Sequence, residues 1–339
     1  MIPEEKKTVV ARALHEAFGA TEYEDIRILT AGLSSALVFR IVVKGRPYLL
    51  RVITRTDAMN DPTRQFTCMR ASAEAGLAPR IWYTSIEDRV SITDFVDARP
   101  FPVAEVLVRL PATLRMLHAL PPFPNTVNYL EAMAGFINKF HAAKILPESE
   151  TSALLQLHAR VMSAYPRNDA DIGFVSQRPE TRKCPLRTGT ASGSSIGNRP
   201  SSTTATSILS VVANFVIITE ADEELFLRTY FGEPPTQYQH ARFYLMRQIL
   251  HMSYAAVFFL IGSAGKPVEP DANVLSFRDF HSRVWSGEIS VAPADTKLQY
   301  ARVHLNQLFA NAGTPRFQDG LQIVSATQGA SQAQTGERR

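Results

Sequence analysis

The pattern of apolar and polar positions predicts a first region that is rich in strands. Apolar side chains recur at helical spacing over 3–19 and the pattern ends at Gly19, which predicts a helix. The alternation over 26–52 predicts three strands joined by the turns GLSS and KGRP. A helix is predicted over 61–75 and another strand over 90–96. Strands with few helices predict a small α+β lobe.

Beyond residue 96 the pattern becomes mainly helical. Helices are predicted over 103–120, 129–144, 148–165, 210–231, 237–261 and 296–312. The last residues, 325–339, are polar and are predicted to be a disordered tail. We therefore predict an α+β protein of two lobes, a β-rich lobe over 1–96 and a larger helical lobe over 97–324.

One segment interrupts this pattern. Residues 176–209 read SQRPETRKCPLRTGTASGSSIGNRPSSTTATSIL, which is rich in Ser, Thr, Arg, Gly and Pro and poor in large apolar residues. Such a tract cannot supply buried apolar area at about 25 cal/mol per Å². We expect it to form an irregular exposed loop and to leave the protein marginally stable or insoluble, given a usual stability of about 5–15 kcal/mol.

Composition narrows the class of protein. A hydrophobic fraction of 45% and 20% charged residues are typical of a globular protein. The N-terminus has no apolar run like that of a signal peptide, and the longest apolar stretch, 255–262, is too short to span a bilayer. Cys68 and Cys184 form neither a disulfide framework nor a metal-ligand pattern. These features predict a cytoplasmic protein without a membrane partner.

The net charge of +4 comes from the interrupting segment. Within 176–209 five cations oppose the single anion Glu180, so the rest of the chain sums to about zero; the cations are Arg178, Arg182, Lys183, Arg187 and Arg199. A basic balance confined to one such tract does not indicate a nucleic-acid-binding face. We therefore expect no nucleic-acid partner.

Seven segments stand out in chain order: TAGLSSALVFRI, YLLRV, AEAGLAPRIW, ITDFV, LRMLHAL, SVVANFV and FLRTYFG. Together they resemble the aminoglycoside phosphotransferase and choline/ethanolamine kinase family. The resemblance covers roughly residues 8–312. It implies a bilobal, protein-kinase-like fold, ATP and Mg²⁺ as cofactors, and a small hydroxylated substrate. Choline, ethanolamine, an aminoglycoside and another sugar alcohol remain open as substrates, and the oligomeric state is not indicated.

The resemblance assigns nucleotide-binding roles in the first lobe. Gly32, Ser34 and Ser35 would bring backbone N–H groups to the ATP phosphates, although AGLSS alone is only a strand turn. Arg51 stands where protein kinases carry Lys and would bind the α/β-phosphates; the alternative is a surface arginine. The helix over 61–70 lacks the Glu expected to pair with it, so Gln65 or Glu74 would have to serve.

Further assignments follow at the lobe boundary. Thr93, Asp94, Phe95 and Val96 would form the hinge whose backbone meets the adenine, a role compatible with a buried strand end. His118 in RMLHAL is interpreted as a helix-packing residue rather than a catalyst. In the helical lobe a possible cage for a quaternary ammonium is weighed against ordinary core packing; its members would be Tyr254, Phe258, Phe259, Trp285 and Tyr300.

The catalytic motifs of the family are missing from the translated chain. An H-x-D-x-x-x-x-N loop supplies the base and one metal ligand, and an I-D-W-E-like strand end supplies the second ligand. By family order both belong within 176–209, and neither is there. The chain therefore has no intact catalytic or metal-binding residue.

Reverse translation of the same segment restores both motifs. Permitted codons for 176–186, read from the second base, encode HNDLKPENVL. Permitted codons for 189–209, read from the third base, encode DRVWLIDWEPPFLNDRYFDL. We infer three small frame changes, near 175, 187–189 and 209. The alternative is a natural Ser/Thr-rich insertion, which would leave the motifs elsewhere in the chain.

Two functions therefore remain. The first is an ATP-dependent phosphotransferase of a small hydroxylated metabolite by family, inactive as this chain is written. The second is a pseudokinase that binds nucleotide or a partner without chemistry.

Overall fold

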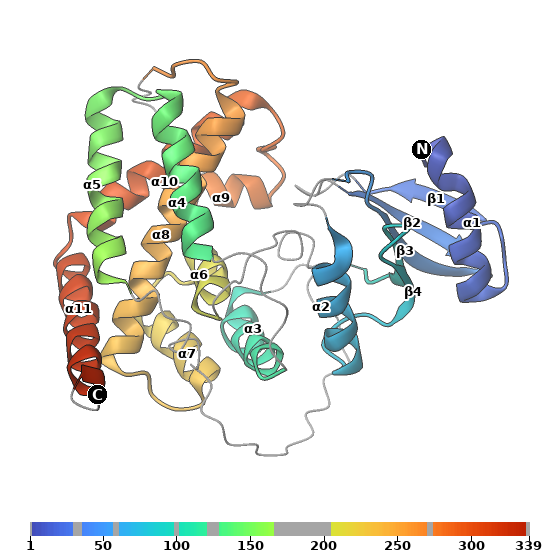
Figure 1. The fold of residues 1–339 in the computed structure, drawn as a ribbon, viewed down its shortest axis with the longest axis horizontal. Coiled ribbons are helices and arrows are strands. Elements are labelled where there is room, and N and C mark those ends of the chain that lie inside the picture. Colours follow the sequence, from blue (N-terminus) through green and yellow to red (C-terminus); the bar gives the residue numbers. More distant parts are fainter. Residues whose placement is uncertain are drawn as a thin grey trace. The chain divides into compact units, whose positions relative to one another are not determined.

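The computed structural model describes residues 2–29, 36–56, 61–97, 102–120, 129–165, 205–269 and 274–336. The described residues form two compact units, the first ending with residue 120 and the second starting at residue 129. Each unit has its own cluster of buried apolar side chains. Figure 1 shows the sheet with α1 and α2, and the helical bundle of the second unit.

The first unit is built on a five-stranded antiparallel sheet with the order β1-β2-β3-β5-β4. Its strands are β1 (Asp25–Ile28), β2 (Leu37–Val43), β3 (Arg46–Val52), β4 (Ile81–Ser85) and β5 (Val90–Asp94). Its helices are α1 (Glu4–Phe18), α2 (Pro62–Glu74) and α3 (Val103–His118).

Local sequence determines where these elements end. Gly19 ends α1 at a φ of 65°, a left-handed conformation that glycine adopts without penalty. Lys44 and Gly45 both have positive φ, 50° and 71°, as the two-residue turn of the β2–β3 hairpin requires. The carboxylate of Asp61 accepts a hydrogen bond from the Thr63 amide at 2.9 Å and caps α2.

One face of the sheet packs against α1. Alternate residues of β2, β3 and β5 are fully buried there together with α1 residues; they include Val10, Leu14, Phe39, Ile41, Leu50, Val52, Val90 and Ile92. Burial of such a side chain contributes about 1.5–3 kcal/mol. The opposite face of the sheet carries the residues between them, among them Arg51 and Thr93.

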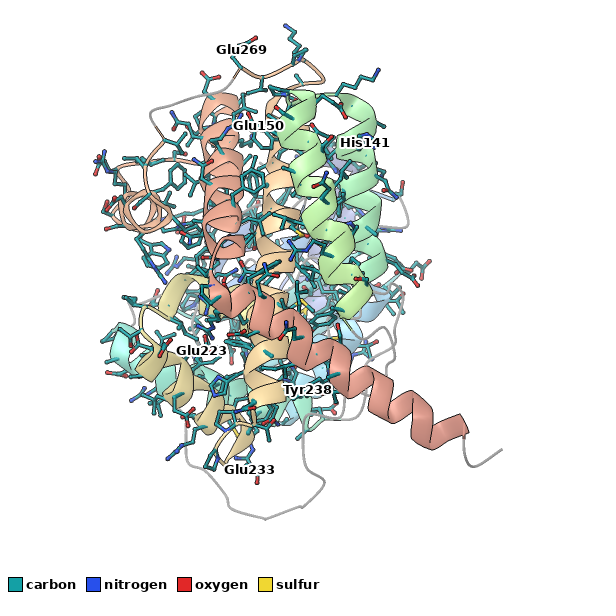
Figure 2. The ribbon with its side chains drawn as sticks, turned by 90° about the vertical axis from the view of Figure 1, so that its left-hand side faces the viewer. His141, Glu150, Glu223, Glu233, Tyr238 and Glu269 are labelled. Carbon is teal, nitrogen blue, oxygen red and sulfur yellow. The ribbon has the colours of Figure 1, made fainter. Side chains whose placement is uncertain are left out.

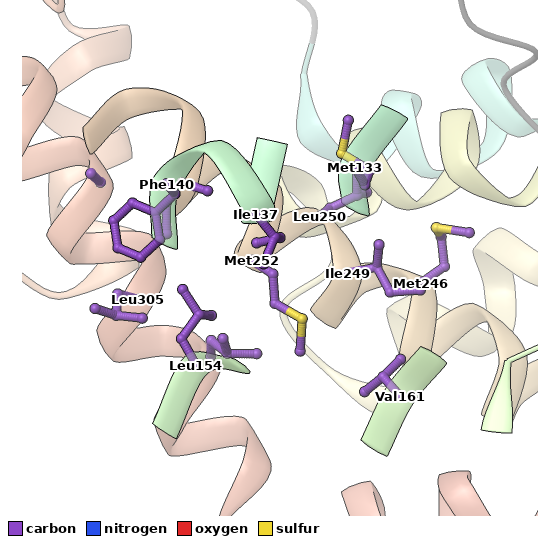
Figure 3. Close-up of a cluster of buried hydrophobic side chains, with 14 of the residues drawn as sticks. Met133, Ile137, Phe140, Leu154, Val161, Met246, Ile249, Leu250, Met252 and Leu305 are labelled. Atoms are coloured by element: carbon purple, nitrogen blue, oxygen red, sulfur yellow. The ribbon is translucent and has the colours of Figure 1, made fainter. Parts of the chain in front are cut away.

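The second unit is helical throughout its described residues. Its helices are α4 (Tyr129–Ala143), α5 (Glu148–Ala164), α6 (Ala205–Val216), α7 (Glu220–Phe231), α8 (Gln237–Gly262), α9 (Phe277–Trp285), α10 (Ala294–Ala312) and α11 (Pro315–Gly336). Helix α8 is the centre of the bundle and packs against α4, α5, α6, α10 and α11. Figure 3 shows part of this core, where Ile249 and Leu250 of α8 lie near Met133 of α4 and Val161 of α5.

Helix α8 is also the one described helix that is long and apolar enough to cross a membrane. However, 72% of its most apolar window is buried inside the structure, and this burial accounts for its apolar composition. The longest uninterrupted apolar stretch, used above to judge membrane spanning, does not detect such a helix because polar residues divide it.

The predicted α+β fold class, with a sheet-containing part and a larger helical part, is confirmed. Sequence periodicity missed three elements, β4, α9 and α11. The single helix predicted over 210–231 is two helices, because Thr219 and Asp222 form a capping box that starts α7. A Thr-x-x-Asp motif inside an apolar pattern was the available signal.

The limits of three predicted regions also differ from the structure. Helix α3 groups with the sheet rather than with the helical lobe that was expected to begin at residue 97. Helix α11 continues to Gly336, through most of the expected disordered tail, because packing of Phe317 and Val324 starts a helix that Ala and Gln residues can extend. Helix α6 begins at Ala205, inside the segment expected to be irregular, and buries Leu209. The rest of that segment, 176–204, lies outside the described residues.

Candidate functional site

Arg51 lies on the sheet face opposite α1. In β3 it alternates with Leu50 and Val52, which point into the α1 core. Register pairs Arg51 with Val38 of β2 and Ser91 of β5, so these three side chains share one face. Arg51 is partly buried, and burial lowers the pKa of its guanidinium. A partly desolvated cation in the middle of a sheet differs from the surface strand arginine considered as the alternative.

The strand end predicted as a hinge has two distinct sides. Thr93 pairs with Leu49 and is buried on the Arg51 face. Asp94 pairs with Tyr48 and therefore lies on the α1 face. There its carboxylate accepts a hydrogen bond from Trp82 Nε1 at 2.7 Å. The Asp94 side chain thus has a structural partner and points away from Arg51.

Backbone hydrogen bonds limit what the hinge can offer a ligand. The Asp94 amide donates to the Arg80 carbonyl at 2.9 Å. The Thr93 hydroxyl donates to the Asp94 carbonyl at 3.3 Å. An adenine edge would therefore meet backbone beyond Asp94, at Phe95 and Val96.

A shallow cavity of about 430 Å³ lies on the α1 side of the same strand end. Tyr48, Trp82, Asp94 and Phe95 line it. Because Tyr48 and Asp94 face away from Arg51, this cavity is separate from the sheet face on which a phosphate-binding arginine was predicted.

The remaining predicted groups of the first unit are placed as follows. Gln65 is partly buried in α2, and Glu74 is exposed in the last turn of the same helix. Gly32, Ser34 and Ser35 lie outside the described residues, so their predicted phosphate contacts stay predictions. Burial lowers the pKa of His118 to about 4, which is consistent with the expected packing role in α3.

The aromatic rings considered as a possible ammonium cage pack against one another. The centroids of Phe258 and Tyr300 are 4.6 Å apart, and those of Tyr254 and Tyr300 are 6.1 Å apart. A cation within about 6 Å of two flanking rings would hold them farther apart. The exposed Trp285 lies in contact with Phe215 rather than with this group. The structure therefore supports core packing, which the spacing of these residues favoured over a cage, for the three packed rings.

A metal site is not formed by the described residues. Within the ranges given above, no group of three or more His, Cys, Asp or Glu side chains could hold a metal ion. The segment in which the resemblance expects the metal ligands contains neither motif. The described residues therefore form no site that fits Mg²⁺.

Comparison with known proteins identifies the fold. The chain matches no protein-family model and no curated protein. Among solved structures it is similar to a choline/ethanolamine kinase family protein from Mesorhizobium loti, with a TM-score of 0.60, 16% identity, and 95% of this chain and 99% of that chain covered. It is similar to a choline kinase from Cryptosporidium parvum, with a TM-score of 0.61, 11% identity and coverage of 94% and 98%.

A third similar structure is a putative aminoglycoside phosphotransferase from Ralstonia eutropha, with a TM-score of 0.51, 12% identity and coverage of 96% and 98%. At these identities the likeness concerns the fold, and it extends over nearly the whole length of each chain. The predicted resemblance is therefore confirmed at that level: the chain has the bilobal, kinase-like fold of choline/ethanolamine kinases and aminoglycoside phosphotransferases.

Proposed function

We propose that this chain is the product of a gene for an ATP-dependent phosphotransferase of a small hydroxylated metabolite, and that the chain as translated is inactive. One observation carries this proposal. The elements on both sides of 176–204 follow the kinase-like fold, whereas that segment contains neither of the motifs that supply the base and the metal ligands.

Arg51 supports the nucleotide half of this proposal. A guanidinium is always charged and forms two parallel hydrogen bonds with a phosphate, which suits it to fix the α/β-phosphates of ATP. The backbone at Phe95 and Val96 would meet the adenine edge, and Gly32, Ser34 and Ser35 would meet the phosphates. ATP would supply the phosphoryl group, and this chain's own residues would bind and orient it.

Loss of the catalytic loop explains the proposed inactivity. Phosphoryl transfer depends on positioning and charge neutralisation more than on covalent chemistry of the protein. A chain that keeps Arg51 but lacks the base and both metal ligands can hold a nucleotide without transferring its γ-phosphate. We propose that the protein is cytoplasmic and that the enzyme with both motifs restored acts on a small molecule, with choline, ethanolamine and aminoglycosides as candidate acceptors.

The decisive experiment compares two proteins that differ only in this segment. The coding DNA across codons 170–215 is sequenced again, and both the translated chain and a chain with HNDLKPENVL and LIDWE restored in frame are purified. Release of ADP from ATP is measured with each candidate acceptor. We expect turnover by the restored chain alone. Equal turnover by the translated chain would overturn the proposed inactivity, and no turnover by a folded restored chain would overturn the kinase assignment.

The alternative is a pseudokinase, which needs only nucleotide binding, and Arg51 on the sheet face opposite α1 is the observation that supports it. It predicts that the translated chain binds ATP without added Mg²⁺ and that Arg51→Gln weakens binding at least about tenfold, or 1.4 kcal/mol. Arg46→Gln, an exposed change at the start of the same strand, is the matched control. Equal binding by both variants would exclude a phosphate-binding role of Arg51.

A further inference from the structure

A polar cavity of about 200 Å³ lies within the helical unit. It is lined by α6, α7, α8, α9, α10 and α11, and the lining side chains that matter here are Asn214, Glu223, Arg247, His251, Arg278 and Arg316. The volume is below that of a pocket for a drug-sized ligand, about 300 Å³ or more, and above that of a single water. It is therefore suited to a small polar ligand.

The negative charge inside this cavity is already neutralised. Glu223, whose side chain is only 3% exposed, uses both carboxylate oxygens. Oε2 accepts from Arg247 at 3.0 Å, and Oε1 accepts from Arg316 and lies 3.1 Å from Nδ1 of His240. Figure 2 shows Glu223 among the side chains of this region. Glu223 is the buried carboxylate of the lining, and both of its oxygens already have arginine or histidine partners.

Arg247 has more hydrogen-bond donors than its bonds to the described residues use. Its Nε donates to Asn214 at 2.8 Å and its Nη1 donates to Glu223. Nη2 donates no hydrogen bond to the described residues. Only 15% of this side chain is exposed, and Nη2 is not among the fully buried unpartnered atoms of the described residues, so an acceptor in the cavity that Arg247 lines can reach it. An arginine nitrogen held in this way is satisfied best by an acceptor inside the cavity.

Arg278 is a second cation on the lining. It donates to the carbonyls of Phe215 and Ile217, which fixes its guanidinium at the C-terminal end of α6. A guanidinium has five N–H groups, and two backbone bonds leave others available. Burial is the main cause that lowers the pKa values of Arg247 and Arg278, and the pKa of Arg247 is lowered further by Arg316 and Arg278. Arg247 and Arg316 share the Glu223 carboxylate, whereas Arg278 is influenced by Asp222, and Glu220 is exposed at the edge of the lining.

His251 adds a neutral donor. Its Nδ1 lies 2.9 Å from Nδ1 of His304, so one ring donates and the other accepts. His304 is fully buried, and its Nε2 has no partner among the described residues. A buried N–H without an acceptor costs more than a lone pair without a donor, so the proton lies on His304 Nδ1. His251 then accepts at Nδ1 and carries its own proton on Nε2, the edge of the ring left for the cavity.

We propose that this cavity is a binding site for a small anion, a phosphate or a carboxylate, held by Arg247, Arg278, Arg316 and the Nε2–H group of His251. All four groups donate hydrogen bonds and three carry positive charge, while the buried carboxylate among them is occupied. Planar guanidinium groups bind both ligand chemistries in pairs of parallel hydrogen bonds. The proposal depends on the helical unit alone and not on the kinase assignment.

The test measures binding of inorganic phosphate and of malonate to the full chain by calorimetry at constant ionic strength. We expect saturable binding with Kd near or below ~1 mM. Arg278→Gln should weaken it at least about tenfold, whereas Arg283→Gln should leave it unchanged. Arg283 is the matched control because it lies on the same helix and pairs with Glu288 outside the cavity. Binding of phosphate alone, or of both anions, supports the site and identifies its chemistry.

A second variant keeps the proposal testable if Arg278→Gln fails to fold. Arg316→Gln removes another lining cation on a different helix and should also weaken anion binding about tenfold. Saturable binding of tetramethylammonium in place of either anion would overturn the proposal. So would the absence of binding, or equal affinity of the cavity variants and Arg283→Gln.

Discussion

The two units of this protein keep their charged side chains in different places. In the sheet unit the ion pairs are superficial, such as Arg12 with Asp88, where the arginine side chain is 54% exposed. The described helical unit has surface pairs too, such as Arg283 with Glu288, but it adds interior ones: Glu223 is 3% exposed and Arg302, which pairs with Glu150, is 8% exposed. Exposed pairs contribute little to stability, whereas breaking a buried pair leaves an uncompensated charge. The helical unit should therefore depend on its charges far more than the sheet unit does.

The largest expected effect comes from Glu223→Gln. The change keeps the side-chain shape but leaves Arg247 and Arg316 without their shared carboxylate. Loss of one partner of a buried pair costs about 3–5 kcal/mol. Urea denaturation followed by far-UV circular dichroism should show this loss in the helical unit.

Two control variants sharpen this result. Glu224→Gln alters the neighbouring, more exposed carboxylate and should change the free energy of unfolding far less. Arg12→Gln removes a surface pair of the sheet unit and should leave its midpoint within experimental error. A similar loss for Glu223→Gln and Glu224→Gln would show that burial of the carboxylate is not the cause, and a similar loss for Glu223→Gln and Arg12→Gln would contradict the difference between the two units.

Truncation of a buried leucine, in contrast, should lower the free energy of unfolding by a similar amount in the two apolar cores. Leu50 in the sheet and Leu250 in α8 are both buried, at 0% and 1% exposure. Leu50→Ala and Leu250→Ala should each cost about 2–5 kcal/mol of unfolding free energy, from lost burial and the remaining cavity. Denaturation is followed by Trp82 fluorescence in a Trp285→Phe background for the sheet unit, and by helix content, which comes mainly from the helical unit. A much smaller loss in one unit would show a loosely packed core there.

A smaller effect is expected at the start of α7, the helix that carries Glu223. Thr219 accepts a hydrogen bond from the Asp222 amide at 3.1 Å, and the Asp222 carboxylate accepts from the Thr219 amide at 2.8 Å. Thr219→Ala removes the first bond and should cost about 1 kcal/mol. Thr229→Ala, within the same helix, is the control, and an equal loss there would show that the cap is not the cause.

The extent of prediction from sequence also differs between the units. The strand that carries Arg51 follows from alternation and the KGRP turn, whereas the face on which Arg51 lies came from the strand register in the structure. The Glu223 cluster could not, because it joins residues of α7, α8 and α11 that are up to 93 positions apart. Helical periodicity marks apolar faces and says nothing about which buried polar groups meet. His251 illustrates this limit, since its spacing to other histidines indicates no site, yet packing places it beside His304.

The smallest expected effect is a pH dependence of the helical unit that originates at His240. Its Nδ1 lies 3.1 Å from Glu223 and its Nε2 lies 3.1 Å from Glu224. The hydrogen bond to Glu223 is the largest influence and raises the pKa of His240 above its ordinary value of 6.5, burial opposes it, and Glu224 raises it further. Because the folded-state pKa is above the unfolded one, the stabilisation is complete below about pH 6.5 and is lost as pH rises through the folded-state pKa.

We therefore expect the urea midpoint of the helical unit to fall modestly as pH is raised from about 6.5 to about 9, and His240→Gln to remove this slope. The buried histidines His251, His281 and His304 have lowered pKa values, so their protonation destabilises the fold only below about pH 6.5. Glu223 also stays ionised over this range, because Arg247, Arg316 and His240 outweigh the effect of burial on its pKa. The change of the urea midpoint above pH 6.5 consequently reports on His240. An unchanged pH dependence in His240→Gln would show that another group causes it.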